Sequence, residues 1–173
     1  MKKQTIKCVT VSMVAVGVVF LMAGLSFAAE KFAYVELRKM FDEYQRTKDA
    51  DAEITALANN KQQERDGLVE EVRRMKDEMV VLADKGDEKR LKQEEIDVKI
   101  KELQQFDEMT RNQLREIRDQ NVKDIFDDLN GAIQKYGEKR GFDFVFSDRA
   151  LAYKNEKLDI TAPILKELNK DYK

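Results

Sequence analysis

Apolar residues in the middle of the chain recur at alternating steps of four and three positions. This spacing is typical of the buried seam of a coiled coil. The seam consists of Leu68, Val72, Met75, Met79 and Leu82. Continued toward the N-terminus with the same steps, it passes through Arg65, Lys61, Ala58 and Ile54, so we expect it to become polar toward the middle.

A second apolar stripe follows the tetrapeptide Asp84-Lys85-Gly86-Asp87, and no proline occurs between positions 36 and 140. The register of this stripe slips around 106–110 and again near Asn121. The pattern predicts two antiparallel helices of about 45 and 50 residues, about 65–75 Å long. We place this hairpin at 46–136. The tetrapeptide, with Asp84, Gly86 and Asp87 as turn residues, forms its reversal, and it lacks the spaced ligands of a calcium loop. The members of the second stripe are Ile96, Ile100, Leu103, Leu114, Ile117, Ile125, Leu129, Ala132, Ile133 and Tyr136.

Pairing the two helices about Gly86 makes facing positions add up to about 172. In this register Val72 faces Ile100, and Arg65 lies opposite Asp107. We therefore predict a cross-hairpin ion pair or hydrogen bond between Arg65 and Asp107, worth no more than about 1 kcal/mol if it is exposed.

The two ends of the chain have a different pattern, which predicts a small β-rich head from residues 29–45 and 137–173. Residues 31–35 and 142–147 alternate as strands do, and Leu151-Ala152-Tyr153 is expected to be a third short strand. A helix is predicted at 36–44, Gly141 is expected to end the long helix, and a last helix begins at Asp159 or Thr161. We expect the strands to meet in one sheet at the base of the hairpin. The expected head-core and trimerisation residues are Phe32, Tyr34, Phe142, Phe144, Phe146, Leu151 and Tyr153.

Three short strands are close to the minimum for independent stability, so this head is small for its aromatic content. A phenylalanine face on so small a sheet favours self-association, and closure into an intermolecular barrel would also remove exposed strand edges. The predicted fold is therefore mainly α, with a long antiparallel helical hairpin on a short-stranded sheet that closes into a barrel by trimerisation.

Residues 1–28 have the features of a secretory signal peptide. Three lysines precede an almost wholly apolar run from Val9 to Leu25, and Ser26-Phe27-Ala28 provides small residues for cleavage. The run also reaches the lower limit for spanning a bilayer, so an uncleaved anchor is the alternative. Cleavage would remove Cys8, the chain's one cysteine, and would change the net charge from −2 to −5, which argues against nucleic-acid binding.

The composition excludes most enzyme classes. Charged residues make up 38% of the chain, compared with about 25% in ordinary domains, so a large globular core is not expected. The sequence contains no histidine, phosphate-binding glycine loop or metal-ligand cluster, and a thin hairpin offers no pocket to tune a carboxylate. We therefore expect no enzymatic activity and no cofactor.

Several apolar residues of the hairpin lie beside the seam or close to its tip. They either pack along the edge of the hairpin or form a weak apolar surface for non-native polypeptides. The segment from Arg73 to Lys92 carries seven basic and five acidic residues; it is either a solvated surface or a site of transient contact with an anionic membrane. The client-binding candidates are Val69, Met79, Val80, Val81, Val98 and Phe106.

Together these parts resemble the Skp/OmpH family of periplasmic chaperones. The resemblance covers essentially the whole mature chain, and its most specific part is Gly141-Phe142-Asp143-Phe144-Val145-Phe146 followed by Leu158-Asp159-Ile160-Thr161. It implies a periplasmic homotrimer with a β-barrel head and three helical tentacles around a cavity. It also implies an ATP-independent holdase that binds unfolded outer-membrane proteins and prevents their aggregation before insertion.

One property departs from the resemblance. The best-known members of the family are basic, whereas this mature chain is acidic, which argues against electrostatic capture of clients. The alternative interpretation is a structural coiled-coil spacer or adaptor of the cell envelope without chaperone activity.

Overall fold

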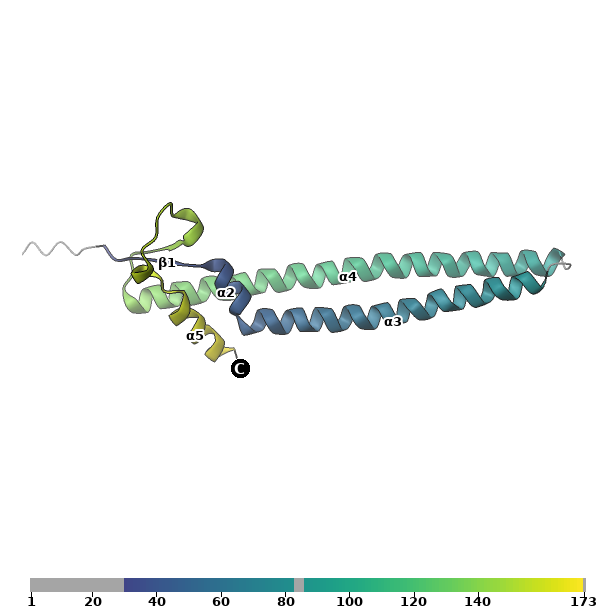
Figure 1. Ribbon diagram of the computed structural model, residues 1–173, viewed down its shortest axis with the longest axis horizontal. Helices are drawn as coiled ribbons and strands as arrows, with labels where there is room; N and C mark the ends of the chain where they lie inside the picture. The colour runs from purple at the N-terminus through teal and green to yellow at the C-terminus, as the bar shows by residue number, and fades with distance from the viewer. Residues whose placement is uncertain (1–29, 83–85, 173) are drawn as a thin grey trace, which may run out of the picture. The chain divides into compact units, whose positions relative to one another are not determined.

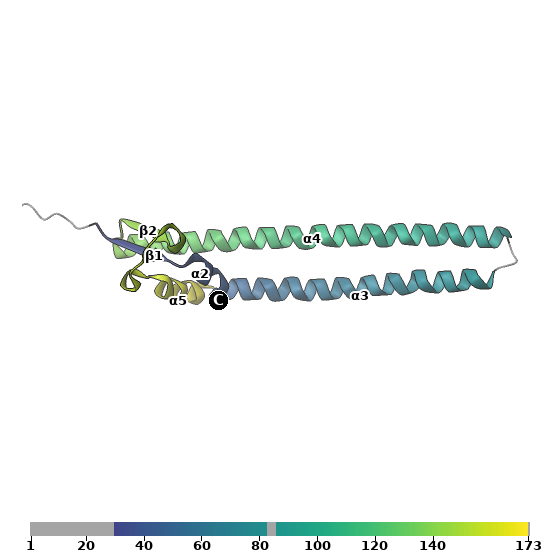
Figure 2. The same cartoon turned by 45° about the horizontal axis from the view of Figure 1, so that its top comes forward.

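The computed structural model describes residues 30–82 and 86–172. Two long helices, α3 (Gln45–Val81) and α4 (Gly86–Arg140), lie side by side over most of that length (Figures 1 and 2). At 1.5 Å per residue, α4 is about 80 Å long and α3 about 55 Å. We call this pair the arm, and the remaining elements together with the base of α4 the head. The predicted signal peptide and Asp84 lie outside the described residues.

The predicted seam forms the inner face of α3. Val72 and Met75 are buried, and so is Ile54 at the far end. Between them the polar seam positions Lys61 and Arg65 are half-buried, so the inner face continues through the polar middle as predicted. Charged residues occupy this inner face because most of the hairpin is only two helices thick and leaves its edges open to water.

The inner face of α4 keeps its four–three steps through the first interruption of its stripe and shifts by one position at the second. Thr110 and Asn121 are half-buried at the expected positions, and the helix is continuous from Gly86 to Arg140. The slip predicted around 106–110 is therefore wrong, since Thr110 only replaces an apolar residue on an unchanged face. The slip predicted near Asn121 is confirmed, because the buried residues Ile125 and Leu129 follow it in successive steps of four.

Helix α4 begins earlier in the chain than predicted. Gly86 and Asp87 belong to α4, whose first turn contains Asp87 and Glu88, where carboxylates interact favourably with the positive end of the helix. The prediction that Gly86 and Asp87 form the turn was therefore wrong. At the other end of α4, Gly141 has φ 65° and ends the helix as predicted.

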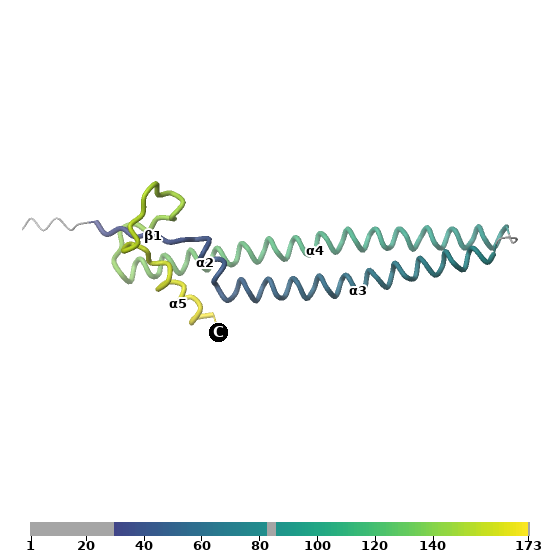
Figure 3. The backbone as a smooth tube through the Cα atoms, in the orientation of Figure 1, coloured from purple at the N-terminus to yellow at the C-terminus, as the bar shows by residue number. Residues whose placement is uncertain are grey.

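The two strands of the head come from the two ends of the described chain. Strand β1 (Phe32–Val35) pairs in parallel with β2 (Phe144–Ser147), with Phe32 opposite Phe144 and Tyr34 opposite Phe146. Parallel neighbours require a crossover connection. Here the whole arm, together with the short helix α2 (Leu37–Glu43), is that crossover, as the continuous trace in Figure 3 shows.

The third strand expected at Leu151-Ala152-Tyr153 is not formed. These residues lie between two short 3-10 helices, η1 (Asp148–Ala150) and η2 (Glu156–Leu158), which turn the chain away from the sheet. It returns only at Asp159, which makes a single bridge to Tyr34, and the Ile160 amide donates to the Tyr34 carbonyl at 3.0 Å. Within the described residues the sheet therefore has two strands, and β1 lies between β2 and this bridge.

The core of the head lies between the inner face of the sheet, the base of α4, and α5 (Thr161–Asp171). Ala33 and Val35 point into it from β1, since alternate residues of a strand face opposite sides. The buried residues of this cluster are Ala33, Val35, Met40, Tyr44, Ile125, Leu129, Tyr136, Ile160, Ile164 and Leu165.

Candidate functional site

The outer face of the sheet carries a stack of three exposed phenylalanines. The ring centroids of Phe32 and Phe144 are 5.8 Å apart, and Phe146 lies 6.3 Å from Phe32 and 6.1 Å from Phe144. Their exposed fractions are 40% for Phe32, 53% for Phe144 and 38% for Phe146. We call these three residues the aromatic face. Beside it, β2 has no second neighbour among the described residues, so its outer edge is unpaired.

Two other expected members of this face add no exposed surface to it. Tyr34 is 2% exposed because Lys154 covers its ring, with the ammonium 5.3 Å from the centroid. Burial is the main cause that raises the pKa of Tyr34, and the ion pair with Glu36 raises the pKa of Lys154. Phe142 precedes β2 and packs against the head core. Both residues therefore stabilise the single chain rather than the aromatic face.

The two expected head-core residues that lie in the loop after β2 differ in their exposure. Leu151 is half-buried, whereas Tyr153 is 82% exposed. The side chain of Tyr153 therefore adds apolar surface to the head, although it does not belong to a strand.

The apolar candidates on the arm fall into two groups. Val69, Val80, Val81 and Val98 are exposed, and the two adjacent valines near the tip most strongly, at 71% and 85%. Met79 is half-buried on the inner face of α3, and Phe106 is half-buried with the Lys61 ammonium 5.5 Å from its ring centroid. Leu91 and Met109 are further exposed apolar residues on α4. The accessible apolar surface of the arm is thus scattered rather than gathered in one groove.

Charged pairs link the two helices in the predicted register. Arg65 Nε lies 2.9 Å from Asp107 Oδ1, so the ion pair expected there is present. Nearer the tip, Lys92 Nζ lies 2.8 Å from Glu78 Oε2, and the hydrogen bond between them lowers the pKa of Glu78 and raises that of Lys92. These contacts fix the alignment of the helices in the polar middle of the inner face and near the tip.

The sequence pattern did not identify a second aromatic pair, at the base of the arm. Phe41 of α2 and Phe126 of α4 stack at 5.4 Å, and Phe126 is 40% exposed. With Leu37 and two arginines they line a pocket of about 260 Å³. The one feature of the sequence that could have indicated this pair is the apolar residue at 126, directly beside the inner stripe of α4. The arginines are Arg38 and Arg149.

The described residues contain no grouping of three or more cysteine or carboxylate side chains that could hold a metal ion. None of the helices in residues 30–82 and 86–172 combines the length and apolarity that a bilayer span requires. What the surface offers is apolar contact area, an unpaired strand edge and many fixed charges.

The fold defines a mainly helical protein in which a long helical hairpin projects from a small sheet with an aromatic face. Comparison with known proteins identifies its family. The sequence profile of the outer membrane protein family OmpH (OmpH-like) matches residues 31–168. The chain therefore belongs to the OmpH-like family, which confirms the resemblance drawn from its sequence.

A solved structure supports the same fold. It is a candidate outer membrane chaperone, OmpH-like, from Caulobacter crescentus CB15, and it superposes with a TM-score of 0.76 at 12% sequence identity. The match covers 82% of this chain and 85% of the other. At this identity the likeness shows the fold alone. A comparison with curated proteins finds no match.

Proposed function

We propose that this protein is an ATP-independent holdase chaperone of the periplasm. It binds unfolded outer-membrane proteins and prevents their aggregation before they insert into the membrane. Membership of the OmpH-like family supports this role, and so does the fold shared with a candidate outer membrane chaperone. Cleavage of the predicted signal peptide at residues 1–28 delivers the chain to the periplasm.

The observation that carries the proposal is the aromatic face beside the unpaired edge of β2. Exposed stacked rings on a two-stranded sheet lower their free energy by burial against a partner, and an unpaired edge can extend a sheet. We propose that three chains bury these faces in a shared barrel. Three arms of about 55–80 Å then surround a cavity large enough for a non-native polypeptide.

Client binding in this proposal uses many weak contacts. The exposed valines of the arm supply apolar area without a shaped pocket, which suits polypeptides of varied sequence. The basic residues between Arg73 and Lys92 make transient contact with an anionic membrane surface, and the chain has no enzymatic role.

Light scattering tests the proposal. An outer-membrane protein unfolded in urea is diluted into buffer with and without the purified chain, at about one trimer per client. We expect suppressed scattering without ATP. No suppression at that ratio rejects the holdase and favours a structural spacer.

A matched pair of triple variants tests the arm contacts. Replacing Val80, Val81 and Val98 by serine is expected to raise the concentration needed for half-maximal suppression severalfold, because exposed apolar area is lost. The control replaces three exposed polar arm residues by serine and should behave as the wild type. Equal activity of both variants rejects the valines as contacts. The control positions are Asn60, Gln105 and Asn112.

A further inference from the structure

The polypeptide changes direction sharply where the head meets the arm. Between α2 and α3, Tyr44 has an extended conformation, with φ −67° and ψ 131°, although neither glycine nor proline is nearby. We call residues Glu43 to Arg46 the arm root. The first amides of an α-helix have no intrahelical partner, and the side chain of Tyr44 does not cap α3.

Helix α5 supplies the missing cap from the other end of the chain. The Gln45 amide donates to Asn169 Oδ1 at 2.7 Å, and Asn169 Nδ2 donates to the Glu43 carbonyl at 3.4 Å. One side-chain amide therefore contacts both the end of α2 and the start of α3. Such caps normally come from the residue just before the helix, so this one makes the start of α3 depend on the position of α5.

Helix α4 holds the arm root from the opposite direction. Tyr44 Oη donates to Asp128 Oδ2 at 2.9 Å, and Arg46 Nη1 donates to the same oxygen at 2.7 Å. Arg46 Nη2 also lies 3.5 Å from Asp124 Oδ2. Burial and the Asp128 carboxylate raise the pKa of Tyr44, so its hydroxyl remains a donor at neutral pH. The arm root is thus held between α4 and α5.

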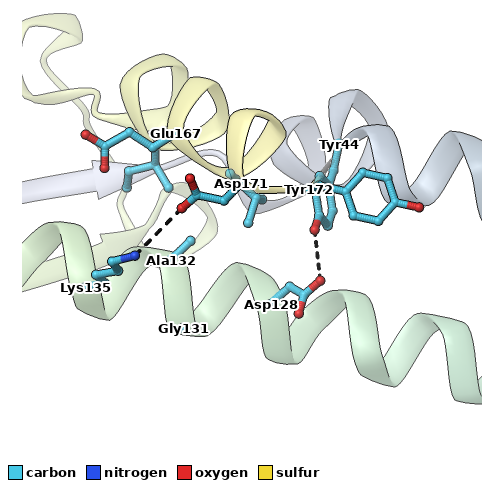
Figure 4. A pocket seen from close by; sticks show the side chains of 10 residues that line it. Tyr44, Asp128, Gly131, Ala132, Lys135, Glu167, Asp171 and Tyr172 are labelled. Atoms are coloured by element: carbon cyan, nitrogen blue, oxygen red, sulfur yellow. Dashed lines mark hydrogen bonds and ion pairs between the residues drawn. The ribbon is translucent and has the colours of Figure 1, made fainter.

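The two halves of α5 are anchored differently. Ile164 and Leu165 in the first half are buried in the head core. The second half stands over a pocket of about 310 Å³ above Gly131 and Ala132 of α4 (Figure 4). It is held there by Leu168, which packs against the head core, by the ion pairs of Glu167 and Asp171 with α4, and by the edge-on packing of Tyr172 against Tyr44, with ring centroids 5.5 Å apart.

The rim contact drawn in Figure 4 is weak. Lys135 Nζ and Asp171 Oδ2 are 3.7 Å apart, and both side chains are mostly exposed. Because the pocket leaves open space beside these contacts, the last turn of α5, which contains Asn169, can lift from α4 while Ile164 and Leu165 remain buried.

We propose that the second half of α5 is a latch that sets the position of α3 against α4 where the arm leaves the head, with Asn169 as the coupling residue. While Asn169 caps α3, the arm root keeps one geometry. When the second half of α5 lifts, the start of α3 loses its cap and α3 shifts about Tyr44 against α4, which runs unbroken from the arm into the head. The device is independent of what the arm binds.

Two measurements on Asn169→Ala test the latch, with the exposed neighbour Lys170→Ala as the control. Hydrogen exchange at the Gln45 amide is expected to become about fivefold faster, as follows from the loss of one hydrogen bond. Pulsed EPR between spin labels at Lys76→Cys on α3 and Ala150→Cys on the head, with Cys8→Ser, is expected to show a broader distance distribution. Labelled chains are diluted into unlabelled ones, and Lys170→Ala should change neither measurement.

Faster exchange with an unchanged distance distribution would show a purely local cap and overturn the proposal, and so would unchanged exchange. Asn169→Asp provides a second test that stands even if Asn169→Ala does not fold. It keeps the accepting oxygen and adds a charge that is favourable at a helix N-terminus. Protection of the Gln45 amide is therefore expected to persist, and its loss in Asn169→Asp would reject the coupling role.

Discussion

Arg65 and Asp107 occupy inner positions where most coiled coils place apolar side chains. Their side chains are 39% and 33% exposed, because the two-helix arm leaves this position open to water. Water screens the attraction, so the pair fixes alignment more than it adds stability.

A double-mutant cycle with Arg65→Ala and Asp107→Ala measures that contribution by chemical unfolding. We expect a coupling free energy of about 0.2–1 kcal/mol. The pair Arg38–Asp42 within α2, at 3.7 Å and with both side chains largely exposed, is the control and should give a value near zero. A coupling above about 3 kcal/mol for Arg65 and Asp107 would mean that the site behaves as buried.

The ion pair between Glu78 and Lys92 predicts a defined pH dependence. The pKa of Glu78 is lowered from its ordinary 4.5 and that of Lys92 is raised from its ordinary 10.5, in each case chiefly by their shared hydrogen bond. Between these two values the pair contributes its full stabilisation. The contribution is lost as the pH falls through the lowered pKa of Glu78, and also as it rises through the raised pKa of Lys92.

NMR titration of the Glu78 carboxyl group checks this dependence. In Lys92→Gln the midpoint is expected to move upward toward 4.5, because the charged donor that favours the carboxylate is replaced by a neutral amide. Lys89→Gln, which changes another lysine of the first turns of α4, should leave the midpoint in place. An unchanged midpoint in Lys92→Gln would contradict the assigned cause.

At the scale of the elements, hydrophobic periodicity correctly predicted which face of a long helix packs against its partner helix. The seam from Leu68 to Leu82 faces α4 because a four–three repeat can bury only one face of a helix. The break at Tyr44 has no such signal. Asn169, Asp128 and Arg46 stabilise it, and these residues are far apart in the sequence. The strand expected at Leu151 is not formed, and the reason is again a contact between distant segments. Local alternation does not show which segment pairs with the free edge of β1.

Two glycines on the long helices predict stability changes of opposite sign. Gly67 is inside α3, and a Cβ there would meet nothing within 4 Å, so Gly67→Ala is expected to stabilise the chain by about 0.5–1 kcal/mol. Gly141 has φ 65°, so Gly141→Ala is expected to destabilise it by about 1–2 kcal/mol. Denaturant unfolding of both variants measures the changes, and each is the other's control. Destabilisation by Gly67→Ala would point to a bend that the arm requires.

At the scale of the whole molecule, the sequence pattern predicted which aromatic residues share a face of the sheet. It did not predict which of them other parts of the chain bury. Phe144 and Phe146 face outward because strand alternation places them together. Tyr34 shares that alternation, yet it is buried by Lys154, which follows it by more than a hundred positions. Phe126 was missed because a residue beside an inner stripe can be either a solvated edge or part of a second surface. Such contacts depend on tertiary structure, which local pattern does not contain.

The proposed assembly predicts the effect of changing the aromatic face. Phe144→Ser together with Phe146→Ser is expected to convert the trimer into monomers in sedimentation, because both rings lose their apolar area at the proposed interface. Far-UV circular dichroism should be unchanged, since neither ring belongs to the head core. Val98→Ser on the arm, an equally exposed apolar position, is the control and should remain trimeric.

This variant also separates assembly from client binding. A monomer keeps every exposed valine of the arm but has no cavity, so suppression of aggregation should fall far more than in Val98→Ser at the same chain concentration. If the double variant is monomeric and still suppresses aggregation fully, the arms bind clients singly and enclosure is not the mechanism. If it remains trimeric, the aromatic face is not the interface, and the pocket at Phe41 and Phe126 becomes the next surface to test.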